Sequence, residues 1–169
     1  ATVKRYKGKV TMWEVWNEPD GGKNGDSYNL YAHLFVRTAK VIREVDPDAK
    51  IAAFGIISPD KEYIRLSLKQ IAKEDGIKYM DYLTYHAYWP SPEEIIPAVR
   101  QLRKDLDEYS PSIGLLQGET GAPSLLEYGH GMKNIEWTEY SQAKWDLRQS
   151  LNHFGMGIPY SFFTMVDLN

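Results

Sequence analysis

The stretch from Trp13 to Asp20 holds the residues best suited to chemistry, because a short apolar run ends there in Trp-Asn-Glu-Pro. Pro19 has no backbone N–H to donate to a sheet and disfavours helix at the residue before it. We therefore expect a strand to end here with the carboxylate of Glu18 at its tip, beside the amide of Asn17. A carboxylate at a strand tip is well placed for chemistry. The alternative is a surface acid beside a turn, and this short motif alone does not decide between the two.

The elements that position this motif follow from the hydrophobic pattern. Short apolar runs alternate with longer amphipathic runs, which is typical of a parallel sheet wrapped by helices. The pattern predicts strands at residues 10–17, 51–57, 79–88, 113–117 and 155–166. It predicts four helices. The first runs from Asp26 or Ser27 to 46–48, the second from 58–60 to Gly76, the third from 90–92 to 110–112, and the fourth from Thr138 to Phe154. The chain is thus expected to alternate five strands with four helices.

Polar and aromatic side chains gather at the ends of these predicted strands. They are Asn17 and Glu18 after the first strand, His86, Tyr88 and Trp89 at the third, and Glu119 at the fourth. Unusual residues at the ends of several parallel strands indicate the mouth of a barrel. A nucleotide-binding sheet would instead have a glycine fingerprint after its first strand, and residues 21–25 match neither the dinucleotide nor the phosphate-loop spacing. We therefore interpret that loop as a connector.

Composition narrows the class of protein further. The chain has 169 residues, of which 43% are hydrophobic, so it can form one domain or part of one. Its net charge of −3 argues against a nucleic-acid partner. It has no cysteine, hence no disulfide or thiolate metal site, and we expect no metal and no cofactor. Aromatic residues make up 13%, which suits the binding of sugar rings.

No apolar run approaches the roughly 20 residues that a membrane-spanning helix needs. We therefore expect a soluble protein with no membrane partner. The basic residues at 1–10 are not followed by the apolar core of a signal peptide, so the sequence leaves the compartment open, with secretion and a periplasmic location among the alternatives.

Three motifs, taken in order, resemble the retaining glycosidases of glycoside hydrolase clan A, which share the (β/α)8 barrel. Residues 16–19 (Trp-Asn-Glu-Pro) resemble the fourth-strand acid/base motif, residues 85–88 (Tyr-His-Ala-Tyr) the sixth-strand histidine and tyrosine, and residues 117–119 (Gln-Gly-Glu) the seventh-strand nucleophile. The resemblance covers nearly the whole chain, and the motifs do not choose between families 5 and 39. It implies an α/β fold in which residues 1–169 are part of a TIM-barrel catalytic domain, from about strand 4 to strand 8.

The same resemblance implies roles for individual residues. Glu18 would be the acid/base and Glu119 the nucleophile of a double displacement on β-linked glycosides. Such an enzyme needs two carboxyls about 5 to 5.5 Å apart, one protonated and one ionised. His86 and Tyr88 would surround the carboxylates and the sugar, and Asn17 would bind the sugar 2-hydroxyl. For His86 the alternative is a structural histidine.

Strand alternation separates the two tyrosines of the second motif, because only one parity can face inward. Tyr88 shares parity with His86, so Tyr85 is expected to pack in the core. Glu14 shares parity with Glu18, and it either orients an arginine or histidine or points to the helices.

Three further aromatic residues are candidates for contact with the sugar: Trp89, Trp137 and Phe163. For Trp89 packing is an equal alternative, and Phe163 stands where members of the clan commonly place a tryptophan. Trp145 lies mid-helix and is expected in the core.

A five-stranded arc leaves open edges with unpaired backbone, so we expect a longer enzyme that supplies the missing N-terminal strands one to three. The arc alone is expected to be inactive. The expected partner is an oligosaccharide or glycoside substrate. Two rival functions remain: a carbohydrate-binding barrel without turnover, and a nucleotide-dependent α/β enzyme, which would lack a phosphate loop.

Overall fold

The computed structural model describes residues 1–21, 28–59, 62–125, 132 and 135–163. Its five parallel strands lie side by side in chain order: β1 (Met12–Val15), β2 (Lys50–Ile56), β3 (Tyr82–His86), β4 (Gly114–Thr120) and β5 (Tyr160–Phe162). The described helices are α1 (Thr2–Tyr6), α2 (Tyr28–Val45), α3 (Glu62–Lys73), α4 (Ile95–Asp107) and α5 (Glu139–Met156), with 3-10 turns η1 (Ile77–Tyr79) and η2 (Pro92–Glu94). Strands in strict chain order form an arc of a barrel, because a doubly wound sheet reverses its strand order.

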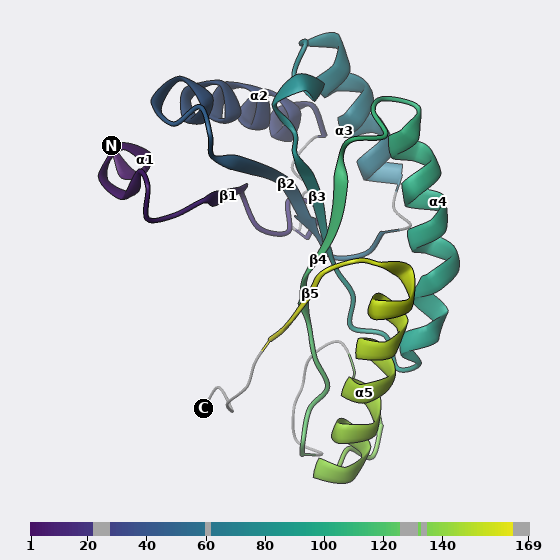
Figure 1. The fold of residues 1–169 in the computed structure, drawn as a ribbon. Coiled ribbons are helices and arrows are strands. Elements are labelled where there is room, and N and C mark those ends of the chain that lie inside the picture. Colours follow the sequence, from purple (N-terminus) through teal and green to yellow (C-terminus); the bar gives the residue numbers. More distant parts are fainter. Residues whose placement is uncertain (22–27, 60–61, 126–131, 133–134, 164–169) are drawn as a thin grey trace.

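The main core lies between the sheet and the helices along its outer side (Figure 1). The helices α2, α3 and α4 each bury a stripe of mainly apolar side chains, and in α4 the buried residues recur at helical spacing. They are Ile95, Val99, Leu102 and Leu106. The helices therefore cover one face of the curled sheet, and the other face is left for the site. Among the described residues, no helix has both the length and the apolar character needed to cross a membrane.

The elements predicted from the sequence are present, but several bounds differ. β1 ends at Val15 and not at residue 17, because Trp16 and Glu18 adopt the left-handed conformation with φ of 70° and 47°. β4 continues to Thr120, so Glu119 lies inside the strand. The predicted helix starts at 26–27 and at 60, and positions 164–166 of the predicted last strand, lie outside the described residues.

Two helix ends also differ from expectation. The left-handed residue after α3 is Asp75 (φ 57°), and Gly76, which we expected in that position, follows it with φ of −90°. α5 extends to Met156, so Gly155 belongs to the helix, and Gly157 (φ 67°) forms its C-terminal cap.

Register shifts interrupt three strand pairings, all toward the carboxyl ends. They lie between Phe54 and Ile56 in β2, between Tyr85 and His86 in β3, and between Gln117 and Thr120 in β4. A bulge bends a strand and changes the direction of the side chains that follow it. The sheet is therefore irregular where the candidate site lies.

Candidate active site

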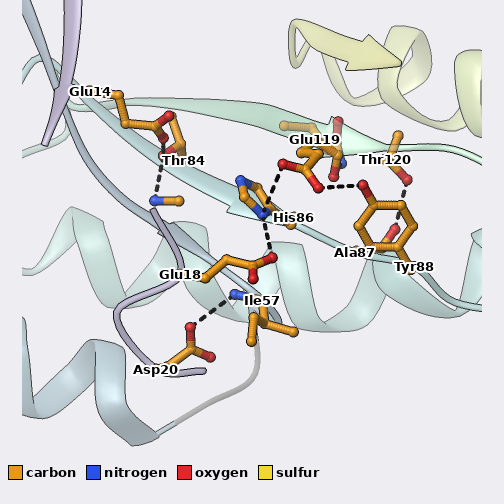
Figure 2. A network of polar contacts seen from close by, with 12 residues as sticks. Glu14, Glu18, Asp20, Ile57, Thr84, His86, Ala87, Tyr88, Glu119 and Thr120 are labelled. Carbon is orange, nitrogen blue, oxygen red and sulfur yellow. Dashed lines mark hydrogen bonds and ion pairs between the residues drawn. The ribbon is translucent and has the colours of Figure 1, made fainter. Parts of the chain in front are cut away.

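Four polar side chains from separate segments meet at the carboxyl ends of the strands: Glu18, His86, Tyr88 and Glu119 (Figure 2). The Nδ1 atom of His86 lies 2.9 Å from Oε1 of Glu18 and 3.8 Å from Oε2 of Glu119. The hydroxyl of Tyr88 donates to Oε1 of Glu119 at 2.5 Å. One imidazole thus stands between two carboxylates, and one of these carboxylates is also held by a phenol.

The alternation of β3 brings His86 to this point. Tyr85 is fully buried, and its hydroxyl contacts Nε2 of His153 on α5 at 3.0 Å. Its neighbours Thr84 and His86 point the other way, toward the carboxylates of Glu14 and Glu18. The expectation that Tyr85 packs while Tyr88 shares the face of His86 is confirmed.

A register shift brings Glu119 opposite His86. Gly118, the residue skipped in this pairing, lies against the imidazole, since a Cβ there would be 3.8 Å from Nε2 of His86. The side chain of Glu119 is 24% exposed and that of His86 only 2%. The nucleophile candidate therefore stands over a buried histidine.

Glu18 is fixed by its backbone. Its N–H donates to the carbonyl of Gly55 at 2.9 Å, and its own carbonyl accepts from the N–H of Gly21 at 3.0 Å. The carboxylate of Asp20 accepts the N–H of Ile57 at 3.1 Å. These bonds tie the turn after β1 to the end of β2. They hold Glu18 in the left-handed conformation, which non-glycine residues adopt mostly at constrained sites.

Burial, together with the hydrogen bond to Glu119 and the charge of that carboxylate, raises the pKa of Tyr88 well above its ordinary value. The phenol therefore stays protonated and acts as a donor to Glu119 over the physiological range. A proton on Nδ1 of His86 satisfies the carboxylate of Glu18 and faces that of Glu119; this tautomer is inferred from the contacts.

Glu18, His86 and Glu119 each offer one ligand atom, and these atoms all lie within 4.8 Å of one another. The two carboxylates are therefore close enough to act on the two ends of one substrate bond. The same three side chains are also of the kind that could hold a divalent cation.

The remaining predicted site residues lie around this group. Asn17 is exposed after β1, and Phe163 is 48% exposed, with its N–H bonded to the carbonyl of Thr120 at 2.7 Å. Trp89 is half-buried against the main core. No hydrogen bond or ion pair joins these three described side chains to the four polar residues, and their contact with a sugar stays a prediction.

Trp137 and Trp145 belong to a second apolar cluster. Trp137 is 5% exposed and donates from Nε1 to the carbonyl of Met132 at 2.9 Å. Trp145, which is buried as expected, belongs to the same cluster, and the partly buried ring of Tyr88 packs against this cluster. A substrate contact of Trp137 stays a prediction.

Sequence reasoning missed Thr84 and Gly55, which lie beside the site. Strand parity offered a signal for Thr84, because it lies two residues before His86 on the same face. Gly55 had no such signal, since a left-handed glycine inside an apolar run looks like any other strand residue.

A curled parallel sheet with its strands in chain order and helices along its outer side defines part of a (β/α)8 barrel, and two glutamates lie at the carboxyl ends of its strands. No protein-family model matches the chain. It is 30% identical over 112 residues to the endo-1,4-beta-xylanase A of Caldicellulosiruptor sp., an overlap of 58% of this chain and 16% of the xylanase.

Solved structures of glycoside hydrolases share the fold. The chain is similar to a glucosidase from Croceicoccus marinus, with a TM-score of 0.71 and 17% identity over 96% of this chain and 35% of that one. A family 39 glycoside hydrolase from Bacteroides cellulosilyticus has a TM-score of 0.67 and 18% identity, and the match covers 95% of this chain and 34% of that one. For a family 44 xyloglucanase from Paenibacillus polymyxa the TM-score is 0.71 and the identity 11%, and the match covers 97% of this chain and 44% of that one. The chain thus spans less than half the length of these structures, and its resemblance to the glycoside hydrolase barrels is confirmed.

Proposed function

We propose that this chain is part of the catalytic domain of a retaining glycoside hydrolase, with Glu18 as acid/base and Glu119 as nucleophile. The observation that carries the proposal is that both glutamates stand at one buried histidine, with carboxylate oxygens within 4.8 Å of each other. Retaining enzymes place their carboxyls about 5 to 5.5 Å apart, whereas inverting enzymes need about 6.5 to 9.5 Å to admit a water. The short separation favours retention.

The two glutamates differ in ways that suit different roles. Glu119 accepts the Tyr88 hydroxyl on Oε1, which holds that oxygen in place and leaves Oε2 for attack. Glu18 has the more exposed side chain, at 34% against 24%, and a route for a proton to and from solvent. Glu119 is therefore suited to attack with its second oxygen, and Glu18 to exchange a proton with the substrate and with water.

In the first step, Oε2 of Glu119 attacks the anomeric carbon while the carboxylic acid of Glu18 protonates the glycosidic oxygen. The C–O bond breaks, the alcohol leaves, and a covalent glycosyl ester forms on Glu119. In the second step, the carboxylate of Glu18 takes a proton from a water that attacks the anomeric carbon. The Glu119 carboxylate is released, and the sugar keeps the β-configuration.

The substrate is an oligosaccharide or glycoside with a β-linked sugar, and the family choice between 5 and 39 stays open. Asn17 is proposed to bind the 2-hydroxyl, and Trp89, Trp137 and Phe163 to contact sugar rings. Similarity to a protein described as a xylanase makes β-linked xylosides a suitable first substrate.

We further infer that residues 1–169 form one catalytic unit only when further β/α units complete the barrel. In the described residues, β1 and β5 each pair on one edge only. An open edge presents unpaired backbone groups, and a barrel removes them by closure. The expected partner is an N-terminal segment of the same polypeptide.

Turnover of aryl β-glycosides by the complete polypeptide tests the proposal. Glu18→Gln is expected to lower the rate about 10²- to 10⁴-fold because general acid catalysis is lost. Glu119→Gln is expected to abolish the covalent step. NMR of the first-formed product should show the β-anomer. Unchanged activity in either variant, or an α-anomer product, would contradict the assignment.

Glu108→Gln is the matched control, because Glu108 is an exposed glutamate at the end of α4, outside the site. Its rate should equal that of the unmodified protein. Removal of divalent cations with EDTA should also leave the rate unchanged; a loss that a divalent cation restores would instead assign the cluster to a metal. Binding of sugars without any turnover would favour the non-catalytic alternative.

A further inference from the structure

A third glutamate, Glu14, lies on the same face as the site and is not used in the proposed reaction. It stands on β1, four residues before Glu18, and its carboxylate accepts the hydroxyl of Thr84 on β3 (Figure 2). Among the described residues, no hydrogen bond or ion pair joins it to an arginine or a histidine, the first expectation for it. Its carboxylate also does not point to the helical layer, which was the second expectation for it.

Thr84 connects Glu14 to the end of β2. Its Oγ1 accepts the N–H of Gly55 at 2.7 Å and also lies 3.0 Å from the carbonyl of Ala53. A hydroxyl has one hydrogen and two lone pairs. When Glu14 takes that hydrogen, the oxygen keeps its lone pairs toward Gly55. The carboxylate of Glu14 therefore sets the direction in which Thr84 accepts.

Gly55 carries the connection to Glu18. It is in the left-handed conformation (φ 56°) at the register shift of β2, so its N–H and C=O leave the regular ladder. The N–H goes to Thr84, and the carbonyl accepts the N–H of Glu18 at 2.9 Å. A continuous series of hydrogen bonds thus runs from Glu14 through Thr84 and Gly55 to the backbone of Glu18.

Glu14 also lies close to the imidazole that binds Glu18. A Cβ on Gly55 would be 3.1 Å from Oε1 of Glu14 and 3.4 Å from Nε2 of His86. Only a glycine allows the carboxylate and the imidazole to approach from two sides of the same backbone position. The opposite ring nitrogen, Nδ1, contacts Glu18.

We propose that Glu14 is a positioning residue for Glu18, acting through the hydroxyl of Thr84 and the backbone of Gly55. The inference rests on the proposed function only for the role of Glu18 as general acid. Glu14 holds the bulge of β2 in the shape that places the Glu18 carboxyl at His86 and at the glycosidic oxygen.

The kinetic test compares two aryl β-glycosides in the complete polypeptide, one with an alkyl-phenol leaving group and one with a dinitrophenol. Only the first needs protonation by Glu18. Glu14→Ala and Thr84→Val are expected to lower kcat/KM, which reports formation of the glycosyl ester, about 10-fold for the first glycoside, the factor for one lost hydrogen bond of about 1.4 kcal/mol. The kcat/KM of the dinitrophenyl glycoside should be nearly unaffected. Glu14→Gln should retain most activity, because its amide oxygen can still accept from Thr84. An equal loss on both substrates, or none, would overturn the proposal.

Amide hydrogen exchange tests the same connection without turnover. In Glu14→Ala, the amides of residues 16–21 and 53–57 are expected to exchange faster, while Glu14→Gln and the exposed control Glu108→Ala match the unmodified protein. Unchanged exchange in Glu14→Ala would refute the connection. Faster exchange across all strands would also refute it, since Glu14 would then act on the whole sheet. If no glycoside is hydrolysed, the proposed function fails, and the exchange experiment still decides the role of Glu14.

Discussion

Tyr88 makes the shortest described contact to the proposed nucleophile, a donated hydrogen bond of 2.5 Å to Oε1 of Glu119. Burial raises the pKa of Tyr88, and the hydrogen bond to Glu119 and the charge of that carboxylate raise it further. The phenol hydroxyl therefore stays protonated, and able to donate, well above neutral pH. A hydrogen bond to an ionised acceptor is about twice as strong as a neutral one. The phenol is therefore suited to hold one oxygen of Glu119 while the other reacts.

Tyr88→Phe is expected to lower kcat/KM about 10- to 100-fold, since a hydrogen bond to a charged group contributes about 1.5 to 3 kcal/mol. The ring stays in its cluster with Trp137, so the melting temperature should hardly change. The control is Tyr85→Phe, which removes the buried hydroxyl bonded to His153. It should cost about 1 kcal/mol of stability and leave kcat/KM unchanged. Full activity of Tyr88→Phe would contradict the assigned contact.

The carboxylates and the histidine could be predicted from the sequence because each follows a short apolar run in a motif of distinctive residues. The packing role of Tyr85 followed from parity alone. The contact of Trp137 could not be predicted, because it depends on the position of the Met132 carbonyl. The link from Glu14 to Thr84 joins strands 70 residues apart and needs their register.

At the level of elements, the register shift at Gly55 shapes the site. Gly55 and Gly157 are both left-handed, with φ of 56° and 67°, so alanine at either position costs about 1 to 2 kcal/mol. They differ in surroundings: a Cβ at Gly157 meets nothing within 4 Å, whereas a Cβ at Gly55 meets Glu14 and His86. Gly157→Ala should therefore lower the melting temperature and keep kcat. Gly55→Ala should lower both, as measured by thermal unfolding and initial rates; equal kcat in the two variants would show that the close approach is unimportant.

The packing of α5 on β3 contains a buried histidine that makes stability depend on pH. Burial lowers the pKa of His153 from 6.5, and the ring accepts from Tyr85 at Nε2 and donates from Nδ1 to the carbonyl of Gln149 at 3.0 Å. The unfolded chain then binds this proton more readily than the folded one. The free energy of unfolding should fall as pH drops through 6.5, and the loss should be complete below the folded pKa.

Urea unfolding at a series of pH values between neutral and acid measures this dependence. His153→Gln should flatten it, and His33→Gln, a change at an exposed residue, should not. A dependence that survives in His153→Gln would assign the effect to another group.

Element order was predictable because apolar periodicity differs between strands and helices. The exact ends were not. β1 stops early because two residues turn left-handed, and β4 runs on because Glu119 still pairs with His86 of β3 through a register that skips Gly118. Both deviations depend on contacts between strands, which local sequence does not encode.

At the level of the whole molecule, the arc has apolar surface at its ends. The outer side of α5 exposes four large side chains at helical spacing. They are Tyr140, Leu147, Leu151 and Phe154. Such a stripe on a helix is typical of a surface that another element covers. The five predicted strands were enough to predict a curled arc instead of a closed sheet. The position of the exposed apolar stripe could not be predicted, because it depends on how α5 is rotated about its own axis.

Phe154 is the most exposed of these side chains, at 83%. A charge at this position tests barrel completion, because it should improve the behaviour of residues 1–169 alone and destabilise the complete polypeptide. In residues 1–169 alone, Phe154→Glu should reduce self-association, because it breaks an exposed apolar stripe. In the complete polypeptide it should lower stability by about 3 kcal/mol or more if a neighbouring helix covers the ring. Light scattering and thermal unfolding measure the two effects, with Lys69→Glu on α3 as an exposed control that should change neither. If residues 1–169 alone are monomeric, cooperatively folded and fully active, the barrel is not completed by another segment and this stripe has a different occupant.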